Sequence, residues 1–124
     1  MTTIPSTPIF ADFAPIAPVP CPCGRAQRGL MTPGNQLCSL HTVEISVNAR
    51  THYHRDHVEV YYFLEGAGEL ELDGVLHPVA PGQAVLIPPG VRHRAVVPPG
   101  RRMRILNYVT PPLRCGRRTL RLTP

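Results

Sequence analysis

Residues 51–66 read Thr-His-Tyr-His-Arg-Asp-His-Val-Glu-Val-Tyr-Tyr-Phe-Leu-Glu-Gly, and this stretch decides the fold. Residues 58–64 are β-branched and aromatic, which favours a strand. His52 and His54 lie two residues apart, so on a strand both side chains point to one face, with their Cα atoms ~7 Å apart. His57 is out of phase with them and is predicted to lie in the following turn.

Short segments of alternating polarity surround this stretch, with a turn signal between each pair. Asp73-Gly74 separates two alternating runs and indicates a hairpin, because both turn positions need positive φ. No segment carries a ten-residue apolar stripe at helical spacing. Many short strands at regular intervals predict an all-β sandwich or barrel. Besides 58–64, the predicted strands are 37–47, 69–72, 75–79, 83–87, 91–97 and 103–110.

A metal site is predicted inside this barrel. Glu59 shares its face with Tyr61 and Phe63, where a carboxylate is costly unless a positive partner is present. His93 begins another strand after the Pro88-Pro89-Gly90 turn. Imidazole and carboxylate together suit a divalent transition metal, with Fe, Mn, Zn, Ni and Cu all left open. The predicted ligands are His52, His54, Glu59 and His93.

The spacings in two separate blocks resemble the cupin superfamily, in particular its small single-domain bacterial members. His52-x-His54-x4-Glu59-x6-Gly66 is similar to the first cupin motif, and Gly82-x5-Pro88-x-Gly90-x2-His93 is similar to the second. The resemblance covers residues 37–110. It implies a double-stranded β-helix, a jelly-roll barrel, with three histidines and one glutamate on a single ion. Ser46 and Val97 stand where the motifs usually have Gly and Asn, and neither position is a ligand.

The chain is predicted to form one domain with two extensions. Residues 1–36 are expected to supply an extended N-terminal arm and a first edge strand, 37–110 the barrel, and 111–124 a basic tail. The tail holds a dense arginine group, which we interpret as solvated rather than polyanion-binding. That group consists of Arg114, Arg117, Arg118 and Arg121.

Composition excludes several partners and locations from the predicted function. The net charge of +5 comes from scattered arginines with few aromatic residues among them, so nucleic-acid binding is not expected. No apolar run approaches the ~18 residues of a membrane span, and the N-terminus lacks a signal peptide, so the expected location is the cytoplasm. In that compartment Cys21, Cys23, Cys38 and Cys115 are expected to be free thiols, the alternatives being a second metal site or a disulfide.

Four residues are candidates for contact with a small-molecule substrate. Arg50 lies two residues before His52 and should share its inward face, and Asn107 should face inward on the last strand. Either side chain could bind a substrate carboxylate or carbonyl. Tyr61 and Phe63 are expected to form the cavity wall. His41, His57 and His77 are interpreted as structural residues, with His77 exposed.

The sequence therefore favours a metal-dependent enzyme acting on an oxygen-rich small molecule, of the dioxygenase, isomerase or lyase type. Glu59 would be both ligand and catalytic base. The alternative is a non-catalytic binding or sensing protein that uses the same barrel, because fold alone does not decide function. A homodimer is also expected, since Val58, Val60, Tyr62 and Leu64 would form an apolar outer face on their strand.

Overall fold

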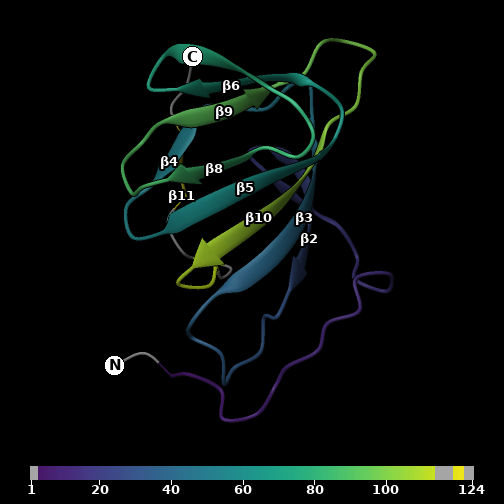
Figure 1. Ribbon diagram of the computed structural model, residues 1–124. Coiled ribbons are helices and arrows are strands. Elements are labelled where there is room, and N and C mark those ends of the chain that lie inside the picture. The colour runs from purple at the N-terminus through teal and green to yellow at the C-terminus, as the bar shows by residue number, and fades with distance from the viewer. Residues whose placement is uncertain (1–2, 114–118, 122–124) are drawn as a thin grey trace.

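The computed structural model describes residues 3–113 and, for the backbone alone, 119–121, and these residues form two antiparallel sheets (Figure 1). One sheet has the order β1 (Val19–Cys21), β2 (Gly24–Gly29), β3 (Ser39–Ile45), β10 (Arg104–Thr110), β5 (Val58–Glu65), β8 (Ala84–Ile87). The other has the order β11 (Thr119–Arg121), β4 (His52–His54), β9 (His93–Val96), β6 (Gly68–Leu72), β7 (Val75–Val79). The described residues contain no helix, and the predicted all-β class is confirmed.

The two sheets face each other and enclose the core. Along β3, β5 and β10 every second residue is buried, as expected for strands with one inward face. Burying such an aliphatic or aromatic side chain contributes roughly 1.5–3 kcal/mol. The buried apolar set includes Val43, Ile45, Tyr61, Phe63, Leu70, Met103 and Ile105.

The turns between strands use the residues that their backbone angles require. Asp73 and Gly74 have φ of 47° and 84°, so the predicted hairpin between β6 and β7 has positive φ at both central positions. Gly66 has φ of 77°, and a Cβ atom there would clash with the Arg102 carbonyl oxygen. Because Gly66 has no side chain, the chain can pass close to the backbone that precedes β10 as it leaves β5.

The N-terminal segment lies along the outside of the barrel before it joins the first sheet (Figure 1). Residues 3–18 form no strand, whereas 19–29 form β1 and β2, two strands where one was expected. The segment contacts its own chain: Gln27 Nε2 donates to the carbonyl oxygens of Phe13 and Ile16 at 2.8 and 3.0 Å. The boundaries 1–36, 37–110 and 111–124 stay a prediction.

The outer face of the first sheet carries the predicted apolar surface, and it extends over three strands. Val60 on β5 is paired with Leu86 on β8 and with Tyr108 on β10. Tyr62 is 43% exposed and Leu86 is 62% exposed. Alternation along the strands puts these side chains opposite the core-facing ones.

Within the described residues, no helix has the length and hydropathy needed to cross a bilayer. Arg114, Arg117, Arg118 and Cys115 lie outside the described residues, as does the side chain of Arg121.

Candidate metal centre

The short strand β4 places His52 and His54 on the inner face of the barrel, as their spacing predicted. Both are buried, whereas Tyr53 between them is partly exposed. His52 is paired directly with His93, the first residue of β9, and their ring centroids are 4.2 Å apart. The turn that precedes His93 is tied to β4 by a hydrogen bond of 2.8 Å from the Gly90 amide to the His54 carbonyl.

Glu59 reaches the same point from the opposite sheet. It is the second residue of β5 and is 2% exposed. Its Oε1 atom lies 2.9 Å from His93 Nε2 and 3.2 Å from His54 Nε2. The four side chains each offer one ligand atom, and these atoms all lie within 4.8 Å of one another.

Backbone carbonyls fix the orientation of two of the three imidazoles. His52 Nδ1 donates to the Arg50 carbonyl and His93 Nδ1 donates to the Val91 carbonyl, both at 2.9 Å. A carbonyl only accepts, so Nδ1 carries the proton in both rings, and Nε2 of the neutral ring presents a lone pair. Such a bond to the non-ligating nitrogen is the usual support of a metal-binding histidine.

The geometry fits one cation between these residues. His93 Nε2 and Glu59 Oε1 are buried and have no hydrogen-bond partner, although they lie only 2.9 Å apart. Two lone pairs at this distance repel unless a proton or a metal ion lies between them. Two ligands at about 2.1 Å from one ion, at an angle near 90°, are about 3 Å apart. Three imidazoles and one carboxylate therefore match a divalent transition metal in both chemistry and spacing.

The same contacts set the charge of the glutamate. Burial by itself would raise the pKa of Glu59, but the adjacent imidazoles of His54 and His93 hold that pKa well below its usual value. The carboxylate is therefore ionised at neutral pH, as a metal ligand must be.

Residues 40–109 match the sequence profile of the cupin domain. The chain belongs to the cupin family. The matched range is close to the 37–110 over which the two motifs were assigned, and it contains all four candidate ligands of this cupin.

This cupin is similar to individual known proteins over different lengths of the chain. A solved protein from Planctomyces limnophilus is 37% identical with a TM-score of 0.77, covering 88% of this chain and 93% of its own. The polyketide cyclase RemF from Streptomyces resistomycificus is 26% identical with a TM-score of 0.74, covering 95% and 87%. Protein SchB from Streptomyces halstedii is 51% identical over 43 residues, which are 35% of this chain and 31% of SchB.

The inward-facing candidates of this cupin lie beside the four ligands. Asn107 Nδ2 donates to Glu59 Oε2 at 2.7 Å, so Asn107 holds the carboxylate that the sequence assigned to the metal. The Tyr61 and Phe63 side chains are fully buried in the barrel, and the Tyr61 ring centroid is 5.9 Å from that of His93. Burial, followed by the neighbouring Cys23 and Glu59 side chains, raises the pKa of Tyr61, so its phenol stays protonated.

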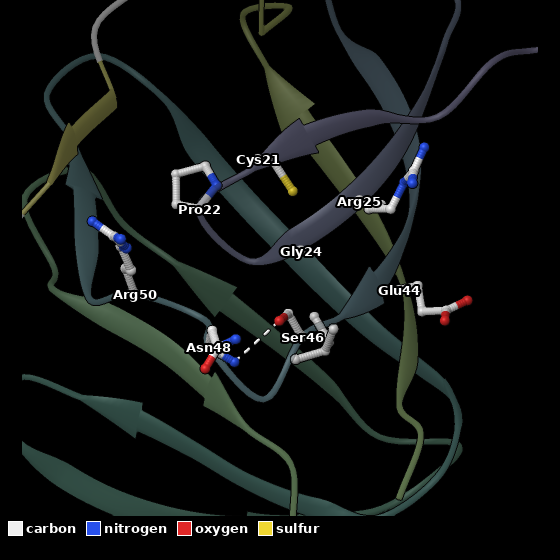
Figure 2. Close-up of a pocket in the computed structure, with 9 residues that line it drawn as sticks. Cys21, Pro22, Gly24, Arg25, Glu44, Ser46, Asn48 and Arg50 are labelled. Atoms are coloured by element: carbon white, nitrogen blue, oxygen red, sulfur yellow. Dashed lines mark hydrogen bonds between the residues drawn. The ribbon is translucent and has the colours of Figure 1, made fainter. Parts of the chain in front are cut away.

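Arg50 does not share the inward face of His52, and that prediction was wrong. Its side chain is exposed and lines a surface pocket of about 460 Å³ together with Arg25 and Glu44 (Figure 2). The alternation expected from His52 does not extend to Arg50, because β4 begins only at His52 and residues 46–51 form a loop. In that loop the Arg50 backbone, rather than its side chain, contacts the candidate site, through the hydrogen bond from His52 Nδ1 to the Arg50 carbonyl.

His41 was interpreted as structural, and the structure places it in a buried row of polar side chains. It lies on the inner face of β3, is 1% exposed, and is aligned with Arg28, Asn107 and Tyr61 across four neighbouring strands. Ser39 Oγ lies 2.7 Å from His41 Nε2. Arg28 Nε, His41 Nδ1 and Asn107 Oδ1 are all buried without a hydrogen-bond partner. This polar row faces the interior next to Glu59. The signal in the sequence was alternation, because His41 lies on the same face of its strand as the apolar residues Val43 and Ile45.

The other two histidines lie where they were predicted. His77 is exposed on β7. His57 lies in the turn after β4, where its Nδ1 donates to the Pro111 carbonyl at 3.0 Å and its ring packs 5.5 Å from that of His54. Cys21, Cys23 and Cys38 form no disulfide among the described residues.

The pKa of His41 predicts a loss of stability in mild acid. Burial, and next the charge of Arg28, lower that pKa from 6.5 to about 4. Between these values the unfolded chain binds a proton that the folded chain does not, so the free energy of unfolding falls as pH drops from 6.5 towards 4. A shift of this size corresponds to at most about 3 kcal/mol. Urea unfolding of wild type and His41→Gln between pH 7 and 5 should show a smaller pH dependence in the variant. Equal slopes would contradict the prediction.

Proposed function

We propose that this cupin is a metal-dependent enzyme that acts on a small, oxygen-rich molecule at the ion held by His52, His54, Glu59 and His93. The observation that carries the proposal is the approach of His93 Nε2 to Glu59 Oε1 at 2.9 Å, with both atoms buried and neither hydrogen-bonded. Such an arrangement is costly in a protein core without a cation. Few groups other than an ion explain why four ligand-type side chains converge here.

The ligand set also favours a class of substrate. Four protein ligands would leave room on a divalent ion for further ligands, and a diketone, enediol or sugar acid has two neighbouring oxygens that could bind there. When bound, the ion would act as a Lewis acid and lower the pKa of a coordinated hydroxyl. The structural relative RemF is a polyketide cyclase, which supports a diketone-type substrate and isomerase or lyase chemistry over dioxygenation.

Residues of the chain would perform the remaining tasks. Glu59 is ionised and is oriented by Asn107, so it is placed to take a proton from a substrate beside it. The unpartnered Nδ1 of His41 and Oδ1 of Asn107 would bind substrate oxygens or hydroxyls along the polar row. Tyr61 and Phe63 would form the apolar wall that excludes water.

The test begins with protein purified without chelator and without a histidine tag. Elemental analysis should find one transition-metal ion per chain. Calorimetric titration with acetylacetone should show binding to the loaded protein and none to protein stripped by EDTA. A panel of diketones, enediols and sugar acids should then contain a compound consumed only by the loaded protein. Binding without consumption across the panel would favour the non-catalytic alternative, and turnover by stripped protein would reject the metal centre.

We also propose that the protein is a homodimer joined through the outer face of the first sheet. Leu86 and Tyr62 are exposed apolar side chains on neighbouring strands of that face. The double variant Tyr62→Arg/Leu86→Glu should be monomeric by light scattering at micromolar concentration, where the wild type is dimeric. Val75→Glu, at an exposed apolar position on β7 of the other sheet, should leave the dimer intact. A monomeric wild type would reject the proposal.

A further inference from the structure

Arg28 places a positive charge on the inner face of the first sheet. It lies two residues after the buried Ala26 on β2 and is paired with the buried His41 on β3, so its side chain points into the barrel. All eight Asp and Glu residues of the chain lie among the described residues, and none of them forms an ion pair with Arg28. Arg28 Nη1 donates a long hydrogen bond of 3.5 Å to the Leu113 carbonyl, whereas Nε is buried and has no partner in the described part of the chain.

His41 presents a second donor on the neighbouring strand. Ser39 Oγ accepts a hydrogen bond of 3.1 Å from the Leu113 amide, so its own proton is free to be donated to His41 Nε2, 2.7 Å away. Burial, and next the charge of Arg28, lower the pKa of His41 to about 4, so the ring is neutral at pH 7. A neutral imidazole that accepts at Nε2 carries its proton on Nδ1. That Nδ1 is buried, and no described residue accepts its hydrogen bond.

The row of polar side chains leads from Arg28 to the metal centre. Asn107 is paired with His41 and donates from Nδ2 to Glu59 Oε2 at 2.7 Å. Neighbouring strands lie about 4.8 Å apart, so the Cα atoms of Arg28 and Asn107 are about 10 Å apart. A molecule whose oxygens bind an ion beside Glu59 can therefore extend past Asn107 and His41 and bring its far end to Arg28.

We propose that Arg28 and His41 form an anion subsite of the metal centre, and that the substrate carries a carboxylate several bonds away from its metal-binding oxygens. This inference rests on the proposed function and narrows its substrate class. The guanidinium and the Nδ1 proton would donate to one carboxylate, and such charge-assisted hydrogen bonds are stronger than neutral ones. The single positive charge of Arg28 matches a carboxylate better than a doubly charged phosphate. Asn107 Oδ1, which is buried and unpartnered among the described residues, would accept from a hydroxyl between the two ends.

Calorimetry with matched diketones tests this assignment. The probes are linear diketones that carry a carboxylate on two, three or four methylene groups, each compared with its methyl ester on metal-loaded protein. At least one carboxylate should bind the wild type roughly 10- to 100-fold more tightly than its ester, the usual effect of a hydrogen-bonded charge. Arg28→Gln should abolish this preference and leave the affinity for the ester unchanged. Arg25→Gln, on the same strand but exposed at the surface pocket (Figure 2), should keep the preference.

The possible results separate this inference from the proposed function. Equal affinities for acid and ester at all three lengths, or a preference that survives in Arg28→Gln, would overturn the anion subsite and leave the metal-dependent function standing. If loaded wild type binds neither acid nor ester, the proposed function fails, and stripped protein then decides the subsite by itself. Millimolar butyrate should shift the NMR signals of the His41 ring in stripped wild type and leave them unchanged in Arg28→Gln. Unchanged signals in the wild type would then overturn the subsite as well.

Discussion

A protein carrying both His52→Ala and His93→Ala should retain only traces of metal after purification without chelator. The two residues are paired across β4 and β9, and their rings are 4.2 Å apart. Their loss leaves two of the four donors, His54 and Glu59, and removes both rings whose orientation is fixed by the carbonyls of Arg50 and Val91. Two remaining donors are too few to hold a labile ion through dialysis. Elemental analysis per mole of chain is the measurement.

A matched variant keeps this result interpretable. His77→Ala also removes imidazole, but from an exposed position on β7, so it should keep the metal content of the wild type. Circular dichroism should show that the double variant is still folded. One equivalent of metal in the folded double variant would refute the assignment of the centre.

Glu59→Gln should separate a catalytic base from a simple ligand. The amide keeps the shape and one oxygen donor, but it removes the negative charge and the ability to take a proton. Metal affinity should fall, and loading should be recovered at high metal concentration. If Glu59 is the base, turnover of the fully loaded variant should be lower by roughly two to four orders of magnitude, the usual contribution of a positioned base.

The comparison requires equal occupancy and a second carboxylate as control. Glu71 on β6 pairs with Arg94 at 3.5 Å and is not among the clustered ligands, so Glu71→Gln should leave turnover unchanged. Activity that returns in proportion to metal occupancy in Glu59→Gln would show that Glu59 only holds the ion. Substrate binding should suffer far less than turnover in the loaded variant.

The difference between Arg50 and Asn107 shows how far sequence alternation can be carried. Asn107 was expected to face inward and does so, because β10 is a long strand with neighbours on both sides. Arg50 was expected to do the same on the basis of His52, but it belongs to a loop and is exposed. Period-two reasoning holds only where a strand continues, and a three-residue strand such as β4 gives no warning of where it ends.

The sequence by itself determined the family, the all-β class and the four candidate ligands. Each of these predictions depends on spacing along the chain. For the ligands, His52 and His54 lie two residues apart on β4, Glu59 lies at the start of β5, and His93 follows a Pro-Pro-Gly turn. Only the tertiary structure decided what surrounds them. The β1–β2 loop brings Cys23 against His52, and the pairing of β3 with β10 aligns His41 with Asn107, which binds Glu59. Contacts between distant strands arise from how whole sheets pack, so spacing along the sequence cannot disclose them.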